Sequence, residues 1–391
     1  MSRHDVIVVG AGPAGATAAA NLARRGHDVM LLDRATFPRD KTCGDGIPPG
    51  TVGILNDLGM RDALEQADFY PIHGIRIGSP AGRSWETAFR SRDEGADFYV
   101  APRREFDALI QSHAVRCGAR FEQAQVSGVL MDDGCARGVV ATIGGREQHI
   151  EAPLVIGADG ATSAVARALG RPRPEARSRG VALRAYVQGV ETIPHRVEFH
   201  FERGLLPGYG WVFPMGPDRA NVGVVLRADR FKAQKRSLRE CFDEYLGGKA
   251  LAGRLTSSAE VSDIATWQLP YAAPHDGRRS FDGALLVGDA AGLVDALTGE
   301  GIHHALVSAT IAADVAHDAL ASGNTGAEQL SRYDRRCEAE LGGLIRRSWR
   351  LQRFVARWPI VLETLFITAR AGGGFVQSFI NRVSTDFVAE G

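Results

Sequence analysis

The N-terminal stretch of the chain joins a buried strand, a glycine-rich turn and a helix of small residues in direct succession. The apolar run 6–9 leads into Gly10, Gly12 and Gly15, which have the G-x-G-x-x-G spacing, and the helix begins at Pro13. Gly10 permits the turn, Gly12 lets the backbone approach a pyrophosphate, and Gly15 lets the helix pack closely on the strand. Phosphates would lie at the helix N-terminus, where unpaired N–H groups and the helix dipole favour anions.

A second strand, 29–32, ends on Asp33. This acid follows the glycines by about 20 residues, where a carboxylate can hydrogen-bond a ribose hydroxyl. The two strands, the helix and the acid together predict a dinucleotide site. The alternative is a glycine-rich turn of an unrelated α/β protein.

The composition is that of an ordinary globular protein. The 391 residues are 45% hydrophobic and 24% charged with a formal net charge of zero, so no global field favours nucleic acid as a partner. Five scattered cysteines form no C-x-x-C pair or Cys/His cluster, so no metal is expected. The chain enters a strand at once and lacks a run of about 18 apolar residues, so we expect no signal peptide or transmembrane helix. A cytoplasmic protein, with room for peripheral membrane contact, is the expectation.

Two later segments repeat the strand-to-turn form of the N-terminus. They lie at 154–163 and 284–291, and a strand-rich block at about 180–270 separates them. We therefore predict an α/β protein in which a discontinuous Rossmann-like domain carries an inserted antiparallel β-sheet domain and is followed by a helical C-terminal region. The predicted boundaries are 1–70, 100–175 and 280–325 for the Rossmann-like domain, 71–99 and 176–279 for the β-sheet domain, and 326–391 for the C-terminal region.

In the last of these segments, Asp289 lies in a glycine turn directly after the apolar strand. A carboxylate there can bond the hydroxyls of an extended dinucleotide. Taken alone, a turn or helix-capping role would be the plainer interpretation, but the N-terminal glycine motif favours the cofactor role. The loop 298–302 then opens a helix whose N–H groups and dipole can stabilise negative charge, as at N1/O2 of a reduced flavin. In the middle segment, Asp159 has two equal interpretations: it reaches the cofactor, or it braces the turn at Ser163.

In this order, the motifs GAGPAG, ADGATSAVAR and GDAAG resemble those of FAD-dependent oxidoreductases of the para-hydroxybenzoate hydroxylase structural class. The resemblance spans residues 1 to about 310 and implies tightly held FAD, with Arg103 near the flavin and the backbone at Val126 near the adenine. The motifs and the resemblance together assign cofactor contacts to Gly10, Gly12, Ala14, Gly15, Asp33, Arg34, Cys43, Gly44, Arg103, Val126, Asp159, Gly288, Asp289, Gly299, Gly301 and Ile302.

Two further segments resemble the geranylgeranyl reductase family. The segment 38–46, PRDKTCGDG, is similar to the family's lysine–x–cysteine–glycine stretch, and YGWVFP at 209–214 followed by NVG at 221–223 matches its Y-x-W-x-F-P…V-G pattern. One departure is Ala296, where the family often has proline. The resemblance implies reduction of isolated C=C bonds in polyprenyl lipids, as in geranylgeranyl or menaquinone-type substrates.

Substrate and catalytic candidates come from these two segments. Tyr209, Trp211 and Phe213 alternate along one strand and share a face, which suits either a wall for an apolar chain or ordinary core packing. Cys43 and Lys41 are the catalytic candidates, and Lys41, two residues away, is expected to lower the pKa of the Cys43 thiol; an incidental loop cysteine is the alternative.

The proton donor and the reductant are not defined by the sequence. His303 and His304 begin the helix after the loop 298–302, and either could donate a proton, but cap histidines are common. No second G-x-G-x-x-G occurs, so the reductant is NAD(P)H bound transiently or a protein electron donor.

Two other functions share this scaffold. One is a flavin monooxygenase or halogenase acting on an aromatic or polyketide substrate. Halogenases tend to carry W-x-W-x-I-P, but here Tyr209 replaces the first tryptophan and Phe213 replaces the isoleucine, which favours the reductase. The other is a flavoprotein that only carries electrons, against which the flavin loop and an apolar cavity argue.

The C-terminal region contains an amphipathic basic helix. Four arginines at helical spacing (346, 350, 353 and 357) lie beside an apolar face that consists of Leu351, Phe354, Val355, Trp358 and Leu362. Such a helix suits a membrane surface or the mouth of a lipid tunnel. The favoured interpretation is a helix packed on the protein with a solvated arginine stripe, ended or kinked at Pro359.

Overall fold

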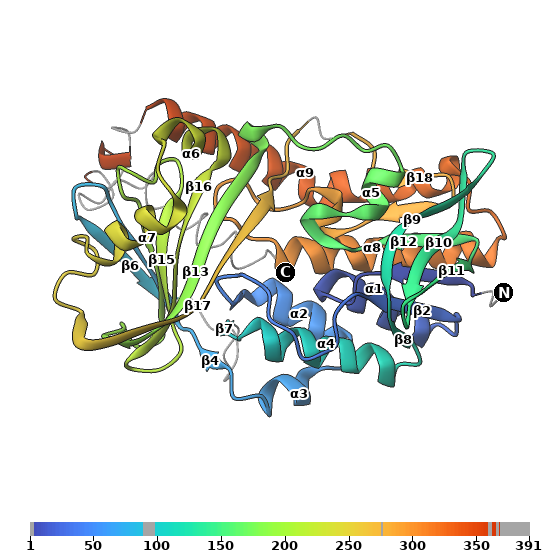
Figure 1. The fold of residues 1–391 in the computed structure, drawn as a ribbon, viewed down its shortest axis with the longest axis horizontal. Helices are drawn as coiled ribbons and strands as arrows, with labels where there is room; N and C mark the ends of the chain where they lie inside the picture. Colours follow the sequence, from blue (N-terminus) through green and yellow to red (C-terminus); the bar gives the residue numbers. More distant parts are fainter. Residues whose placement is uncertain (1–3, 89–97, 275–276, 359–361, 365–366, 368–391) are drawn as a thin grey trace.

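The computed structural model describes residues 4–88, 98–274, 277–358, 362–364 and 367. A six-stranded sheet with its helices forms one half of the molecule, and a seven-stranded sheet forms the other (Figure 1). The predicted α/β class with a Rossmann-like part, an inserted β-sheet and a helical C-terminal region is confirmed. The exact domain boundaries stay a prediction.

The six-stranded sheet is made from three distant parts of the chain. Its order is β18 (Ser280–Phe281), β19 (Ala284–Leu286), β12 (Leu154–Gly157), β1 (Val6–Val9), β2 (Val29–Asp33) and β8 (Arg120–Gln123). All neighbours pair in parallel except β18 and β19. Val9 pairs with Gly157, which pairs with Leu286, so the three strand-to-turn segments end side by side.

Alternation along β1 gives this sheet two buried faces. Val6 and Val8 pack in a core with the helices α1 (Pro13–Arg24), α4 (Arg103–Arg116) and α8 (Ile302–Ala321). Ile7 and Val9 pack in a second core on the opposite face. That face is covered by the short helix α5 (Ala164–Ala168) and a three-stranded sheet of β9 (Gln125–Asp132), β10 (Cys135–Ile143) and β11 (Arg146–Glu151).

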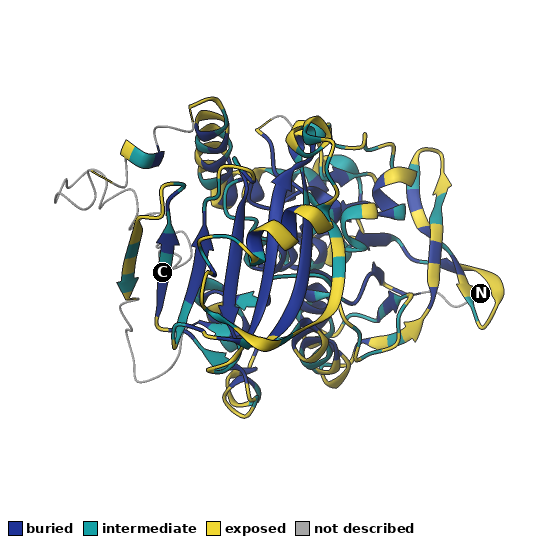
Figure 2. Ribbon diagram, turned by 60° about the vertical axis from the view of Figure 1, so that its left-hand side comes forward, coloured by how far each residue is buried: buried dark blue, intermediate teal, exposed yellow. Residues whose placement is uncertain are grey.

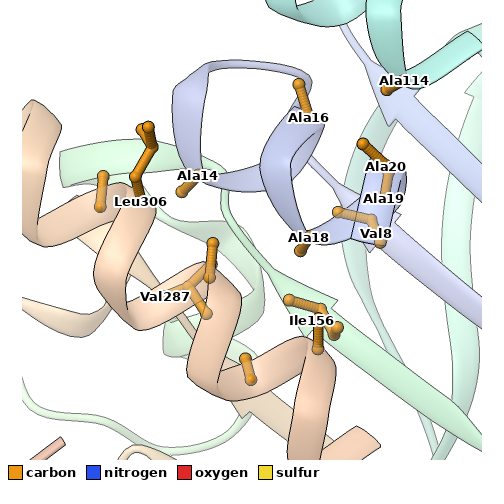
Figure 3. Packing of buried hydrophobic residues seen from close by; sticks show 14 of the residues in the cluster. Val8, Ala14, Ala16, Ala18, Ala19, Ala20, Ala114, Ile156, Val287 and Leu306 are labelled. Atoms are coloured by element: carbon orange, nitrogen blue, oxygen red, sulfur yellow. The ribbon is translucent and has the colours of Figure 1, made fainter. Parts of the chain in front are cut away.

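Small residues let α1 approach its neighbours closely. A Cβ on Gly15 would lie 1.7 Å from the carbonyl oxygen of Gly10, so only glycine fits there. Gly10 itself has a φ of 101°, which side chains rarely adopt. Figure 3 shows Ala14 of α1 beside Leu306 of α8, in the same core as Ile156 of β12 and Val287, which directly follows β19.

The seven-stranded sheet is the inserted one. Its order is β17 (Leu255–Pro270), β13 (Arg179–Val190), β16 (Arg219–Arg227), β15 (Tyr209–Pro214), β14 (Arg196–His200), β5 (Gly74–Gly78) and β6 (Ser84–Ala88). It is antiparallel except for the pair β14–β5. The central strands are buried along most of their length, while β17 is largely exposed (Figure 2). The helices α6 (Ala228–Gln234) and α7 (Leu238–Leu246) pack on β13 and β16.

Short elements connect the two halves. The strands β3 (Gly46–Ile47), β7 (Tyr99–Val100) and β4 (Tyr70–Pro71) form a small sheet. In the chain, the helices α2 (Pro49–Asp57) and α3 (Arg61–Glu65) lie between β3 and β4. The segment 34–45 before β3 contains no helix or strand. We call residues 38–46 the cysteine loop.

The C-terminal helix α9 (Ala327–Arg357) packs along the protein. Only part of its predicted apolar face is buried: Val355 and Leu362 are buried, whereas Phe354 and Trp358 are 46% and 52% exposed. The favoured interpretation of a helix packed on the protein therefore holds for α9, and Pro359 lies outside the described residues. Within the described ranges, no helix is long and apolar enough to cross a membrane.

Candidate active site

A cavity of about 660 Å³ lies where the ends of β1, β2 and β12 face the inserted sheet. It is lined by every predicted cofactor residue except Gly15 and Gly288, which instead pack tightly within the turns. The lining residues from the predicted set are Gly10, Gly12, Ala14, Asp33, Arg34, Lys41, Cys43, Gly44, Arg103, Val126, Asp159, Tyr209, Trp211, Phe213, Asp289, Gly299, Gly301 and Ile302.

The nucleotide end of the cavity is built for an anion. Gly12 caps α1 without a side-chain hydrogen bond, which leaves the N–H groups of the first turn available. The guanidinium of Arg39 lies over this turn, 3.2 Å from the position that a Cβ on Gly12 would take. Unpaired N–H groups beneath an arginine fit the pyrophosphate of FAD. Arg39 was not among the sequence candidates, since it lies in an irregular loop.

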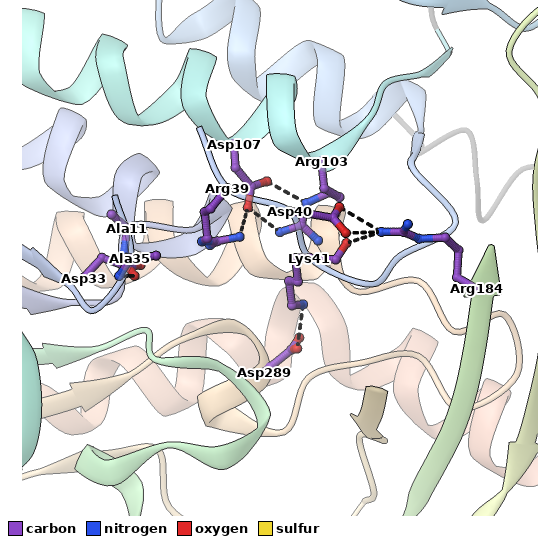
Figure 4. Close-up of polar contacts among 10 residues, drawn as sticks. All are labelled: Ala11, Asp33, Ala35, Arg39, Asp40, Lys41, Arg103, Asp107, Arg184 and Asp289. Atoms are coloured by element: carbon purple, nitrogen blue, oxygen red, sulfur yellow. Dashed lines mark hydrogen bonds and ion pairs between the residues drawn. The ribbon is translucent and has the colours of Figure 1, made fainter. Parts of the chain in front are cut away.

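A buried acid holds Arg39 in place together with Arg103. Asp107 of α4 is fully buried, accepts two hydrogen bonds from Arg103 at 2.6 and 2.7 Å, and lies 2.9 Å from Arg39 (Figure 4). Burial lowers the pKa of Arg103, but the effects of the Asp107 carboxylate and of Cys43 together raise it by more. One acid thus directs two cations into the cavity.

The acids at the three strand ends have different partners. Asp33 accepts hydrogen bonds from the backbone N–H groups of Ala11 and Ala35 at 2.8 and 2.9 Å, while still lining the cavity. Asp159 accepts from the Ser163 hydroxyl and from the backbone N–H of Ala164 at 2.6 Å. Of its two interpretations, bracing the turn is therefore the one that its hydrogen bonds support.

At the third strand end, Asp289 meets the cysteine loop. Its carboxylate lies 3.3 Å from Nζ of Lys41 (Figure 4). Asp289 also lines the cavity beside the flavin loop, which we define as residues 298–302. A Cβ on Gly301 would lie 3.5 Å from Oδ1 of Asp289, so the acid and the flavin loop are neighbours.

Tyr209, Trp211 and Phe213 of β15, which we call the aromatic wall, face the cavity from the inserted sheet. All three are buried and pack in one cluster with Phe199, whose ring lies 5.2 Å from that of Tyr209. The Tyr209 hydroxyl donates to the backbone carbonyl of Thr298 and so joins the wall to the flavin loop. The residues Phe199, Trp267 and Leu269 extend the apolar lining and were not predicted.

Cys43 lies between the aromatic wall and Arg103, and its thiol does not have the predicted reactivity. Burial raises the pKa of the Cys43 thiol; Arg103 and Lys41 lower it by less. Lys41 does lower the pKa of the thiol, but the expected overall decrease is wrong. The pKa is raised, because desolvation outweighs the nearby cations. Cys43 is a neutral thiol rather than a thiolate.

His303 is a poor acid, and His304 is held by a backbone carbonyl. Burial lowers the pKa of His303 to about 4, so its ring is neutral at physiological pH. His304 is buried, and its Nδ1 lies 2.7 Å from the Leu293 carbonyl oxygen. The carboxylate of Glu300 accepts a hydrogen bond from the His303 backbone N–H at 2.7 Å, which caps the start of α8. Among the described residues, no group of three His, Cys, Asp or Glu side chains is placed to hold a metal ion.

Comparisons with known proteins agree with this geometry. A family model described as an FAD binding domain matches residues 3–348. The digeranylgeranylglycerophospholipid reductase 1 of Methanopyrus kandleri is 35% identical over 342 residues, 86% of each chain. The menaquinone reductase of Mycolicibacterium smegmatis is 34% identical over 331 residues, 80% of this chain and 76% of the relative.

Solved structures show the same fold. A geranylgeranyl bacteriochlorophyll reductase-like protein from Thermoplasma acidophilum superposes with a TM-score of 0.84 at 25% identity, covering 94% of this chain and 91% of the other. The myxobacterial chondrochloren halogenase has a TM-score of 0.78 at 26% identity, covering 88% and 82%.

The fold and the cavity define the class, an FAD-dependent oxidoreductase. Within that class, the chain belongs to the geranylgeranyl reductase family.

Proposed function

We propose that this protein reduces isolated C=C bonds in a polyprenyl lipid of the geranylgeranyl or menaquinone type. The observation that carries the proposal is the aromatic wall, which places three buried rings on the same cavity as the cofactor residues. An apolar chain needs such a water-poor surface to reach a flavin. The names of the relatives, which include menaquinone and digeranylgeranylglycerophospholipid reductases, support a substrate of this kind.

FAD, when bound and reduced, supplies a hydride from N5. The residues of this chain have three tasks beside it. Arg39, Arg103 and the first turn of α1 hold the anionic pyrophosphate end. The aromatic wall holds the alkene and excludes water. Cys43, as a buried thiol on the same cavity, supplies the proton that the second alkene carbon needs, while the ion pair of Lys41 with Asp289 keeps its loop against the cofactor site.

A monooxygenase or halogenase on an aromatic or polyketide substrate is the second candidate, because halogenases share the fold. One observation disfavours halogenation. A halide needs N–H donors or cations near the flavin, and the start of α8 is such a place. Here the Glu300 side chain already accepts the hydrogen bond of the His303 N–H at that position, so this donor is not available to a halide.

We propose that the reductant binds transiently, as NAD(P)H or as a protein donor, since the described residues form a single dinucleotide-type fold. We also propose that lipid reaches the cavity from a membrane surface. The exposed rings of Phe354 and Trp358, with Arg353 and Arg357 on the same helix, would meet the bilayer.

An anaerobic assay tests the reaction. Enzyme reduced with dithionite is mixed with geranylgeranyl diphosphate or a menaquinone, and the products are analysed by mass spectrometry. The proposal predicts the gain of one H2 for each saturated bond without O2. Product that forms only with O2 and that carries oxygen or halogen would support the second candidate.

A further inference from the structure

Asp45 is a buried carboxylate two residues beyond Cys43 in the cysteine loop. Its side chain is 0% exposed, although most aspartates lie at protein surfaces. Its backbone has a φ of 64°, the left-handed region that asparagine and aspartate tolerate best after glycine. A charged group in such a place needs specific partners.

The partners of Asp45 come from the inserted sheet. Its Oδ2 accepts hydrogen bonds from the Tyr186 hydroxyl of β13 and from Nδ2 of Asn221 of β16, both at 2.8 Å. Its Oδ1 is buried and has no hydrogen-bond partner among the described residues. The acid is therefore held through one oxygen by two strands that are far from it in sequence.

Asn221 extends this contact to the catalytic candidates. Its Nδ2 also donates to the backbone carbonyl of Cys43 at 2.8 Å, and its Oδ1 accepts from Nε1 of Trp211 at 2.9 Å. One amide thus joins Cys43, Asp45 and the aromatic wall. The loop also lies against the wall, because a Cβ on Gly44 would come within 3.0 Å of the Phe213 ring.

We infer that Asp45 is a positioning residue for Cys43: with Asn221 and Tyr186 it fixes the cysteine loop on the inserted sheet. This inference deepens the proposed function and rests on it for its catalytic meaning. The hydrogen-bond geometry does not depend on which lipid is reduced.

The surrounding charges support this role. Burial raises the pKa of Asp45 to about 6, against the lowering effects of Tyr186, Asn221, Arg184 and Arg103, so the group is ionised at neutral pH. Burial, the largest cause, and the charge of Asp45 raise the pKa of the Cys43 thiol, whereas Arg103, Lys41 and a hydrogen bond from the Asp45 backbone lower it. Arg184 is in turn neutralised by Asp40 at 2.7 Å.

The chemical consequence is that the Cys43 thiol stays protonated until an alkene is present. When it acts, the S–H bond breaks, the electron pair stays on sulfur, and the proton forms a C–H bond with one alkene carbon. FAD, when bound and reduced, would supply the hydride for the other alkene carbon, so that the alkene would be reduced and the flavin oxidised. The negative charge of Asp45 then favours return of a solvent proton to sulfur.

The test is the ionisation of Cys43 itself. The full-length, FAD-loaded protein is labelled with cysteine carrying 13C at Cβ, and the Cys43 resonance, assigned by its absence in Cys43→Ser, is followed as the pH is raised. Asp45→Asn preserves an acceptor for Tyr186 and Asn221 but removes the charge. It should lower the midpoint of the Cys43 titration by at least about half a pH unit, which is about threefold more thiolate at a given pH.

A matched control is Asp133→Asn, the same substitution at another left-handed residue, in the exposed turn between β9 and β10. It should leave the midpoint unchanged. If Asp45→Asn does not fold, Asp45→Gly provides the same test, because glycine adopts this φ without strain. A folded Asp45 variant with an unchanged or raised midpoint overturns the inference. This titration uses no prenyl substrate, so its result does not depend on whether the proposed function is correct.

Discussion

The Lys41 ammonium lies 3.3 Å from the Asp289 carboxylate, so an ion pair joins the cysteine loop to the strand end that precedes the flavin loop. Both groups line the cavity. We expect Asp289→Ala to raise the Kd for FAD about tenfold or more, since a charged hydrogen bond contributes roughly 1.5–3 kcal/mol. Lys41→Met should have a smaller effect, because Lys41 orients the acid. Fluorescence titration of the stripped protein with FAD measures both, and equal losses in the two variants would contradict this division of roles.

Arg39 should be a main source of FAD affinity. Its guanidinium lies over the first turn of α1, where the pyrophosphate fits. Arg39→Gln should weaken FAD binding about tenfold and flatten the dependence of Kd on salt concentration, because one charge-assisted contact is lost. The matched control is Arg104→Gln, since Arg104 is exposed and does not line the cavity. Equal effects of the two substitutions would remove Arg39 from the site.

The aromatic wall is tested by Trp211→Leu. Trp211 is buried and donates to Asn221, so the variant loses stability, by roughly 3–5 kcal/mol if the ring is wholly structural. If the ring also holds substrate, the folded, yellow fraction should show a raised KM or a lowered kcat. Unchanged kinetics per folded molecule would make Trp211 core packing and remove it from the proposed substrate surface.

Much of the fold follows from local sequence patterns. The apolar run 6–9, the glycine spacing and the strand-to-turn segments are short-range signals, and they predict a Rossmann-like sheet with an inserted β-sheet. The cavity residues at the strand ends follow from the same rule, because parallel strands present their carboxyl ends at one edge.

The contacts that orient these residues were not predictable. Arg184 meets Asp40 across 144 residues, and Asn221 meets Asp45 across 176. In each pair, a residue of the cysteine loop contacts a strand of the seven-stranded sheet. No periodicity or spacing in the sequence links the two residues of a pair. The sign of the Cys43 shift was missed for the same reason: the nearby Lys41 is visible in the sequence, whereas burial is not.

Asp45 makes the stability of the protein depend on pH in a defined way. Its pKa is raised from 3.8 to about 6 by burial, so the stabilisation relative to the unfolded chain is fully present below about pH 4 and is lost as the pH rises through 6. The free energy of unfolding of wild type relative to Asp45→Asn should therefore fall between about pH 4 and pH 7, by on the order of 3 kcal/mol at most.

Urea unfolding of both proteins across this pH range measures the difference. Asp133→Asn should follow wild type at every pH. A difference between wild type and Asp45→Asn that stays constant with pH would show that Asp45 does not titrate in this window.

The central claim is that the flavin cavity reduces an isolated alkene, and a single-turnover experiment tests it most directly. The FAD-loaded enzyme is reduced without O2, mixed with a polyprenyl substrate in D2O, and followed by flavin absorbance and product mass. Our account predicts that the flavin reoxidises only when substrate is present, and that each saturated bond gains deuterium, because the hydrogen on N5 of reduced FAD and the Cys43 thiol both exchange with D2O. Reduced flavin that stays reduced with every prenyl substrate, but reacts with O2 to modify an aromatic one, would contradict it.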